Sequence, residues 1–339
     1  MDLKKIEKIL KDEPKYRLTQ AMDFVFKNFG ESWGASNLPK DIKEKLEKEA
    51  SLKIEAKIFW ANDNKSSKAV INLKDGKRIE AVLMKHKDRN TVCVSSQVGC
   101  PMACAFCATG KMGFERNLFA EEILEQALFF ARLLKEDGER VSNIVFMGMG
   151  EPMLNFEEVM KAAKFFNEKM EIGARKISIS TCGIIPGIKK LADLKRQYNL
   201  ALSLHAPSDR LRGELMPINK KYKIADILEA TSDYMNKTGR KVLIEYILFK
   251  GINDSIIHAE ELADILKKNL KGPFVVNLIL YNKTTGGFLP SEKNEVNSFK
   301  KELGRNGVEA TERYRFGRGI EGACGQLRKN NEENDNFFD

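Results

Sequence analysis

The 339-residue chain lacks several features that would place it in a membrane or outside the cell. It has no run of about 18 apolar residues, the minimum for a membrane-spanning helix. Its first residues, MDLKKIEKILKDEPKYR, are charged and amphipathic and lack the apolar core of a signal peptide. No internal repeat and no low-complexity linker is present. These absences predict a cytoplasmic protein without a membrane anchor.

Cysteine and histidine are also scarce. Only six cysteines occur, but Cys100, Cys104 and Cys107 lie within eight positions of one another. This clustering favours a metal site in a reducing compartment over a disulfide scaffold. The chain has three histidines, His86, His205 and His258.

The composition is that of a folded protein with a basic surplus. Apolar residues make up 42% of the chain, which excludes a disordered protein. Lys and Arg number 57 against 48 Asp and Glu, giving a net charge of +9. Such a surplus suits a polyanionic partner such as RNA, but a well-solvated surface explains it equally well.

Hydrophobic periodicity divides the chain into four parts. Residues 1–60 show helical spacing and predict a small N-terminal helical domain. Residues 61–90 alternate in the manner of strands and predict a β extension. Residues 91–327 alternate strand and helix about six times, which predicts a parallel sheet, either a full or partial β/α barrel or a doubly wound sheet. Residues 328–339 are acidic and predict a frayed tail.

The individual elements follow from short apolar runs and from helical spacing. Strands are expected at residues 68–73, 78–83, 91–95, 143–147, 176–181, 200–204, 242–248 and 275–281. Helices of the repeating region are expected at residues 120–135, 156–168, 188–195, 224–236, 256–268 and 295–304.

The cysteine triad forms the pattern CxxxCxxC within GCPMACAFCATGKMGF. Three thiolates can bind three irons of a 4Fe-4S cluster and leave the fourth iron open to a ligand. The alternative is a zinc site completed by a distant fourth ligand. Zinc sites usually show CxxC twice, and no second pair is present here, so the cluster is favoured.

The triad with Phe106 before Cys107 resembles the signature of radical S-adenosylmethionine (SAM) enzymes. Further segments resemble one branch of them, the RlmN/Cfr family of rRNA adenine methyltransferases, and most closely its RlmN members. These segments are VCVSSQVGC (92–100), FMGMGEPMLN (146–155), SLHAPSDRLRGELMPINKKY (203–222) and ACGQL (323–327). The resemblance implies an α/β fold with a partial (βα)6 barrel and an RNA-binding N-terminal helical domain. It also implies a 4Fe-4S cluster on Cys100, Cys104 and Cys107, and SAM as cofactor.

The resemblance also implies a set of SAM contacts, all at predicted strand ends: Gly150, Glu151, Ser180, Ser203, Leu204, His205 and Asn282. GMGEP is no dinucleotide loop, because Met153 stands where GxGxxG needs its last glycine. Its glycines would let the backbone approach a ligand, and Glu151 can accept hydrogen bonds from a ligand amine. Taken singly, Ser180 reads as a plain strand residue and His205 as a structural histidine.

Three catalytic roles are implied in the same way. Cys324 matches the cysteine that becomes S-methylated, Cys93 the resolving cysteine that forms a disulfide with it, and Glu80 the group that accepts the ring proton. Without the resemblance, the two cysteines would be small buried hydrophobes and Glu80 an exposed strand residue. Cys182 matches no role and is interpreted as structural.

RNA contact is suggested by RYRFGR (313–318) and KKYK (220–223), which combine cations and aromatics. The resemblance implies 23S rRNA and tRNA as substrates, an electron donor such as flavodoxin or ferredoxin, and a monomeric enzyme. Pro152 resembles the branch that methylates adenine C2, whereas FMGMG and STCGIIPGIKK resemble the C8 branch. The alternative of another class is a zinc-stabilised, non-catalytic RNA-binding protein.

Overall fold

The computed structural model describes residues 1–284, 286–313, 316–317 and 319–327. The acidic tail predicted for residues 328–339 lies outside the described residues, as do Tyr314, Arg315 and Arg318 of the RYRFGR segment. Among the described residues, no helix is both long and apolar enough to cross a membrane.

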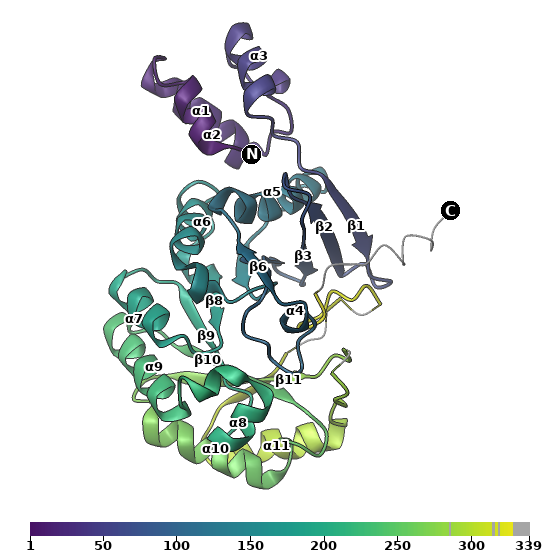
Figure 1. Ribbon diagram of the computed structural model, residues 1–339, viewed down its shortest axis with the longest axis vertical. Coiled ribbons are helices and arrows are strands. Elements are labelled where there is room, and N and C mark those ends of the chain that lie inside the picture. Colours follow the sequence, from purple (N-terminus) through teal and green to yellow (C-terminus); the bar gives the residue numbers. More distant parts are fainter. Residues whose placement is uncertain (285, 314–315, 318, 328–339) are drawn as a thin grey trace.

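The N-terminal region is helical, as predicted, but ends earlier than residue 60. Its helices are α1 (Leu3–Ile9), α2 (Lys15–Phe26) and α3 (Lys40–Glu49), and they form a separate lobe in Figure 1. Residues 56–60 are not helical: they form strand β1 (Ala56–Trp60), which pairs antiparallel with β2 (Ser66–Asn72). The run Ile58–Trp60 is β-branched and aromatic, which favours a strand over a helix.

Ten strands form one continuous sheet in the order β1-β2-β3-β4-β7-β8-β9-β10-β11-β12. Strands β1 to β4 pair antiparallel, whereas every pair from β4 to β12 is parallel. The remaining strands of the sheet are β3 (Arg78–Lys85), β4 (Asn90–Cys93), β7 (Asn143–Phe146), β8 (Ile177–Thr181), β9 (Asn199–Ser203), β10 (Val242–Leu248), β11 (Phe274–Leu280) and β12 (Ala310–Glu312). Because β1 and β12 are free edges, the barrel is partial, as expected for a radical SAM fold.

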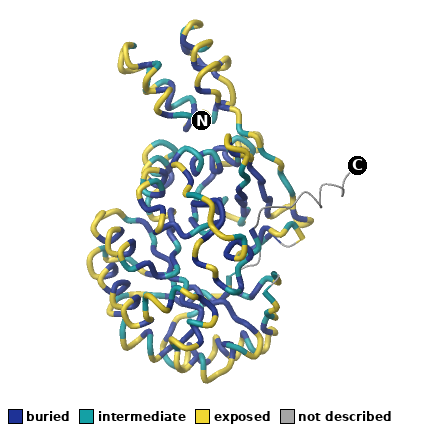
Figure 2. Tube along the Cα trace, in the orientation of Figure 1, coloured by how far each residue is buried: buried dark blue, intermediate teal, exposed yellow. Residues whose placement is uncertain are grey.

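Helices connect the parallel strands and cover the outside of the curved sheet (Figure 1). They are α5 (Ala120–Glu136), α6 (Phe156–Glu168), α7 (Ile185–Asp193), α9 (Ile224–Thr238), α10 (Ile256–Asn269) and α11 (Lys293–Arg305). Shorter elements are α4 (Ala108–Lys111), α8 (Asp209–Leu215) and the hairpin of β5 (Gln97–Gly99) and β6 (Phe114–Asn117). Figure 2 shows the buried residues concentrated along the strands and the inner helix faces.

The last described residues, 316–317 and 319–327, return to the start of the sheet and to the cysteine loop. The Gly317 amide donates to Ser66 Oγ at 2.9 Å, on strand β2. Ala108 N donates to the Gly325 carbonyl at 2.8 Å, and Thr109 Oγ1 to the Leu327 carbonyl at 2.6 Å. These bonds hold ACGQL against the loop that carries the cysteine triad.

Candidate active site

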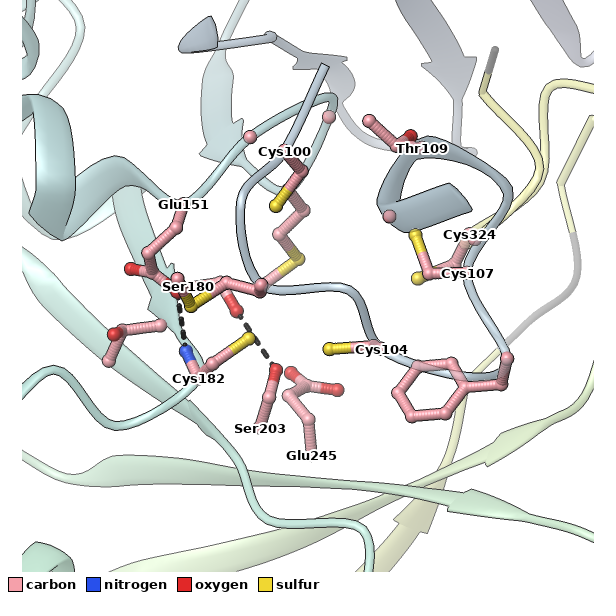
Figure 3. Close-up of a pocket in the computed structure, with 18 of the residues that line it drawn as sticks. Cys100, Cys104, Cys107, Thr109, Glu151, Ser180, Cys182, Ser203, Glu245 and Cys324 are labelled. Carbon is pink, nitrogen blue, oxygen red and sulfur yellow. Dashed lines mark hydrogen bonds between the residues drawn. The ribbon is translucent and has the colours of Figure 1, made fainter. Parts of the chain in front are cut away.

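One pocket lies at the carboxyl ends of the parallel strands, where barrel active sites are built. Most of the predicted site residues line it, and Figure 3 shows them converging from the cysteine loop, the ends of β7, β8 and β9, and the C-terminal segment. Those residues are Cys100, Cys104, Cys107, Gly150, Glu151, Ser180, Ser203, His205 and Cys324.

Backbone hydrogen bonds fix the shape of the cysteine loop. Cys100 N donates to the Gly113 carbonyl at 2.7 Å, and Cys107 N donates to the Cys104 carbonyl at 3.1 Å. Gly99 has a φ of +76°, and a Cβ there would lie 2.1 Å from the Gly113 carbonyl oxygen. Only glycine fits at that position, so the loop depends on it.

The three thiols fit an iron-sulfur cluster better than a single metal ion. Among the described residues, no three His, Cys, Asp or Glu side chains are grouped so that they could hold one ion. Zinc needs its ligands to converge on one point, whereas the thiolates of a cluster each bind a different iron. Burial raises the pKa of Cys100 to about 12 and that of Cys107 to about 11, so a cluster must displace their protons.

The glycines of GMGEP serve chain packing as well as the pocket. Gly150 has a φ of +102°, and a Cβ there would lie 2.6 Å from Gln97 Cβ. A Cβ on Gly148 would lie 2.7 Å from Ser95 Oγ. These glycines were expected to leave room for a ligand. In the structure they also leave room for the neighbouring segment from Ser95 to Gln97, which packs against them.

Hydrogen bonds hold both the backbone amide and the side-chain carboxylate of Glu151. Its backbone amide donates to Gln97 Oε1 at 2.8 Å, and its carboxylate accepts from Met153 N at 3.0 Å and Cys182 N at 2.7 Å. The side chain is buried, and burial raises its pKa. Each carboxylate oxygen has a second lone pair, so the group can still accept from a ligand amine.

The other predicted SAM contacts divide into two groups. Ser180 and Ser203 face one another, with their hydroxyl oxygens 3.5 Å apart in the pocket. His205 also lines the pocket; its Nδ1 accepts from Ile247 N at 3.1 Å, and burial lowers its pKa to about 3. Leu204 and Asn282 are not among the lining residues: Leu204 is fully buried, and Asn282 Nδ2 donates to the Cys324 carbonyl at 3.3 Å.

The three predicted catalytic residues are only partly brought together. Cys324 is exposed and lines the pocket, whereas Cys93, at the end of β4, is buried outside its lining. Both are free thiols, so the predicted disulfide is not formed in this structure. Burial raises the pKa of Cys93 to about 12.

Glu80 is not the exposed strand residue that its sequence context suggests. Its side chain is 2% exposed, and its Oε1 lies 2.9 Å from Lys68 Nζ, which is 4% exposed. The pair lies on β3 and β2 and does not line the pocket. It is close to the C-terminal segment, because a Cβ on Gly322 would lie 3.6 Å from Lys68 Cβ.

Three further residues line the pocket that the sequence analysis did not place there. Cys182, interpreted as structural, is one of them: the neighbouring Cys104 and burial raise the pKa of its thiol, and the two sulfurs point toward one another in Figure 3. Glu245 and Arg313 line the same pocket, with Arg313 Nη1 3.8 Å from Glu245 Oε2. Glu245 had a signal, as the single charge in the apolar run VLIEYIL.

The two predicted RNA-contact segments therefore differ in placement. Arg313 of RYRFGR turns into the pocket rather than toward an outer surface. Three of the four residues of KKYK, Lys220, Lys221 and Lys223, are exposed, with Tyr222 half-buried between them. The latter remains available to a phosphate backbone.

Comparisons with known proteins agree with this geometry. The model of the radical SAM superfamily matches residues 94–264. The chain is 42% identical to a probable dual-specificity RNA methyltransferase RlmN of Dictyoglomus thermophilum, over 96% of this chain and 95% of that protein. It is 46% identical to the ribosomal RNA large subunit methyltransferase N of Nitrosopumilus maritimus, over 79% of this chain and 78% of that one. The crystal structure of a radical SAM methyltransferase from Sphaerobacter thermophilus superposes with a TM-score of 0.91 at 40% identity, covering 97% of this chain and 98% of that chain.

Proposed function

Because the chain belongs to the radical SAM superfamily and, within it, to the RlmN family of RNA methyltransferases, we propose that it methylates C2 of an adenosine in large-subunit ribosomal RNA, and an adenosine in tRNA as a second substrate. The observation that carries the proposal is the placement of Cys324. This exposed thiol, far along the chain, shares one pocket with the cysteine triad and Glu151.

Methylation of an adenine carbon requires both the cysteine triad and the Cys324 thiol. An adenine C–H carbon is not a nucleophile, so it cannot attack the methyl group of a sulfonium directly. A 4Fe-4S cluster held by Cys100, Cys104 and Cys107, with SAM bound, would supply a carbon radical through one-electron cleavage. Cys324 then serves as the methyl carrier that presents a thioether to this radical and to the base.

The remaining steps need a proton acceptor and a second thiol. Once the methylene carbon of Cys324 is bonded to the ring, the adduct would return one electron to the oxidised cluster and Glu80 would take the ring proton, which restores the aromatic ring. The Cys93 thiolate would then attack the Cys324 sulfur, so that a disulfide forms, the bond between that sulfur and the methylene carbon breaks, and the released carbon takes up a proton to become the methyl group of the product. The Lys68 ammonium, 2.9 Å from Glu80, favours the ionised carboxylate that this role requires. Cys93 and Cys324 are both free thiols, which the exchange step requires.

We assign the binding of SAM to the part of the pocket lined by Glu151, Ser180 and Ser203. Glu151 would accept from its amino group, and the Ser180 and Ser203 hydroxyls are available to its ribose. The N-terminal helices and the exposed lysines of KKYK would contact the RNA backbone, and a flavodoxin or ferredoxin would supply electrons to the monomeric enzyme.

The test uses protein reconstituted anaerobically with iron and sulfide, and unmodified ribosomal RNA as the substrate. After reaction with SAM and a reductant, the RNA is digested to nucleosides and compared with 2-methyladenosine and 8-methyladenosine standards by mass spectrometry. The proposal predicts 2-methyladenosine and about four irons per chain. Formation of 8-methyladenosine would overturn the C2 assignment, and bound zinc without methylated nucleoside would indicate an RNA-binding protein instead.

A further inference from the structure

Within the described part of the chain, a buried carboxylate oxygen in the pocket has no hydrogen-bond partner. Glu245 is 3% exposed and lies in the middle of β10. Its Oε2 accepts from Asn277 Nδ2 at 2.9 Å, and Asn277 Oδ1 in turn accepts from Thr311 Oγ1 at 3.3 Å. Glu245 Oε1 has no hydrogen-bond partner among the described residues. A buried acceptor left unmatched is costly, which makes Oε1 a candidate ligand contact.

Neighbouring strands hold this carboxylate in one orientation. In the parallel register Glu245 lies beside Ser203 on β9 and beside Asn277 on β11. Asn277 thereby fixes Oε2, and Figure 3 shows the carboxylate directed toward Ser203 and Cys104, inside the pocket. Because Glu245 lines the pocket, its carboxylate lies beside the space that a ligand would enter.

Arg313 supplies a donor beside this acceptor. Its Nη1 lies 3.8 Å from Glu245 Oε2, and its guanidinium donates to Met147 Sδ at 3.3 Å, which is a weak acceptor. Arg313 and Cys324 line the same pocket. A donor and an acceptor thus stand side by side next to the thiol assigned as the methyl carrier.

This pair matches the edge of adenine that carries N6 and N1. The N6 amino group donates and the neighbouring N1 accepts, and enzymes that act on a flipped base read that edge by hydrogen bonds. Guanine and uracil present the reverse pattern, a carbonyl oxygen beside a ring N–H, which would set an acceptor against Glu245 and a donor against Arg313. Cytosine shares the adenine pattern, but its C2 carries an oxygen and has no hydrogen to replace.

We propose that Glu245 and Arg313 form the reading site for the target adenine, with Glu245 Oε1 accepting from the N6 amino group and an Arg313 N–H donating to N1. This inference rests on the proposed methyltransferase function and adds its base specificity. Because C2 is bonded to N1 and C8 belongs to the other ring, contact at N1 brings C2 toward Cys324 and turns C8 away.

The test pairs protein variants with altered bases at the target position of a ribosomal RNA fragment. Purine riboside lacks the N6 amino group, and 1-deazaadenosine lacks N1. For the unaltered enzyme we expect each change to lower kcat/KM about 10- to 100-fold, the range for one hydrogen bond to a charged group. Glu245→Ala should remove most of the adenosine-to-purine preference, and Arg313→Lys most of the adenosine-to-deazaadenosine preference.

Matched controls separate recognition from damage. Glu245→Gln preserves volume, and Glu312→Gln changes an exposed carboxylate next to Arg313 and should leave both preferences intact. Iron content, RNA-free cleavage of SAM and S-methylation of Cys324 should stay at the level of the unaltered enzyme in Glu312→Gln, and the same three measurements on the Glu245 variants detect damage to the pocket. An unchanged adenosine-to-purine preference in Glu245→Ala and Glu245→Gln would overturn the inference, and so would loss of RNA-free SAM cleavage in both. Absence of RNA methylation by the unaltered enzyme would instead refute the proposed function.

Discussion

Replacement of Gly150 by alanine tests how the fold positions Glu151. Gly150 has a φ of +102°, which L residues rarely adopt, and its new Cβ would lie 2.6 Å from Gln97 Cβ and 2.9 Å from Gln97 N. The backbone strain costs about 1–3 kcal/mol, and the overpacking about 1–3 kcal/mol more. We therefore expect Gly150→Ala to lower the free energy of unfolding by about 2–6 kcal/mol.

The clash between a new Cβ at Gly150 and Gln97 should also change the position of Glu151 in the pocket. Gln97 Oε1 accepts from Glu151 N at 2.8 Å, and Gln97 Nε2 donates to Asn117 Oδ1 at 2.8 Å. A displaced Gln97 cannot keep both bonds, so the Glu151 carboxylate should shift. We expect SAM binding by the reconstituted variant to weaken about tenfold or more, which corresponds to one lost hydrogen bond to a charged group.

The matched control is Gly213→Ala. Gly213 lies in α8, and a Cβ there would meet nothing within 4 Å. Because alanine favours a helix over glycine, this change should be neutral or stabilising by up to about 1 kcal/mol. Anaerobic thermal melts and equilibrium dialysis with SAM measure both variants. If Gly150→Ala melts and binds SAM like Gly213→Ala, the reasoning about the Gly150 contact is refuted.

Four other residues give sharp predictions. Cys104→Ala should lose bound iron and SAM cleavage together, since two thiolates cannot hold the cluster; reductive SAM cleavage by this variant would show that the triad is misassigned. Cys93→Ala should still methylate Cys324 but accumulate a protein–RNA adduct, seen as a shifted band that ribonuclease trims, and normal turnover would remove the two-cysteine mechanism. Glu80→Gln should stall at the same adduct, and rapid release of product would exclude it as the proton acceptor. For His205, burial holds the pKa in the folded protein near 3, below the usual histidine pKa of 6.5, so the stability that it contributes is present above pH 6.5 and is lost as the pH falls toward 3. His205→Asn, which suits the φ of +58° at this position, should flatten the loss of stability measured between pH 7 and 5, and an unchanged slope would contradict this.

The central parallel strands were predictable because they are short apolar runs that are largely buried in the sheet. The run at residues 242–248 was expected as a strand and is β10 (Val242–Leu248) in the structure. Strand β1 (Ala56–Trp60) was missed because it is an edge strand with mixed burial, and its pairing with β2 decides its conformation. Strand β12 (Ala310–Glu312) has only three residues and depends on β11 in the same way.

The site residues likewise divide into those that the sequence pattern indicates and those that only the fold brings together. Cys100, Cys104 and Cys107 are ligands close in sequence, so their spacing alone indicates a cluster. Glu245 and Arg313 meet only because β10 and the segment after β12 reach the same pocket, a consequence of strand order that spacing along the chain does not reveal.

The most direct measurement of the central claim is mass spectrometry of RNA nucleosides from cells with and without this gene. The account predicts that 2-methyladenosine in large-subunit ribosomal RNA disappears when the gene is deleted, returns with the unaltered gene, and does not return with a gene encoding Cys324→Ala. Unchanged 2-methyladenosine after deletion, or its restoration by Cys324→Ala, would contradict the account.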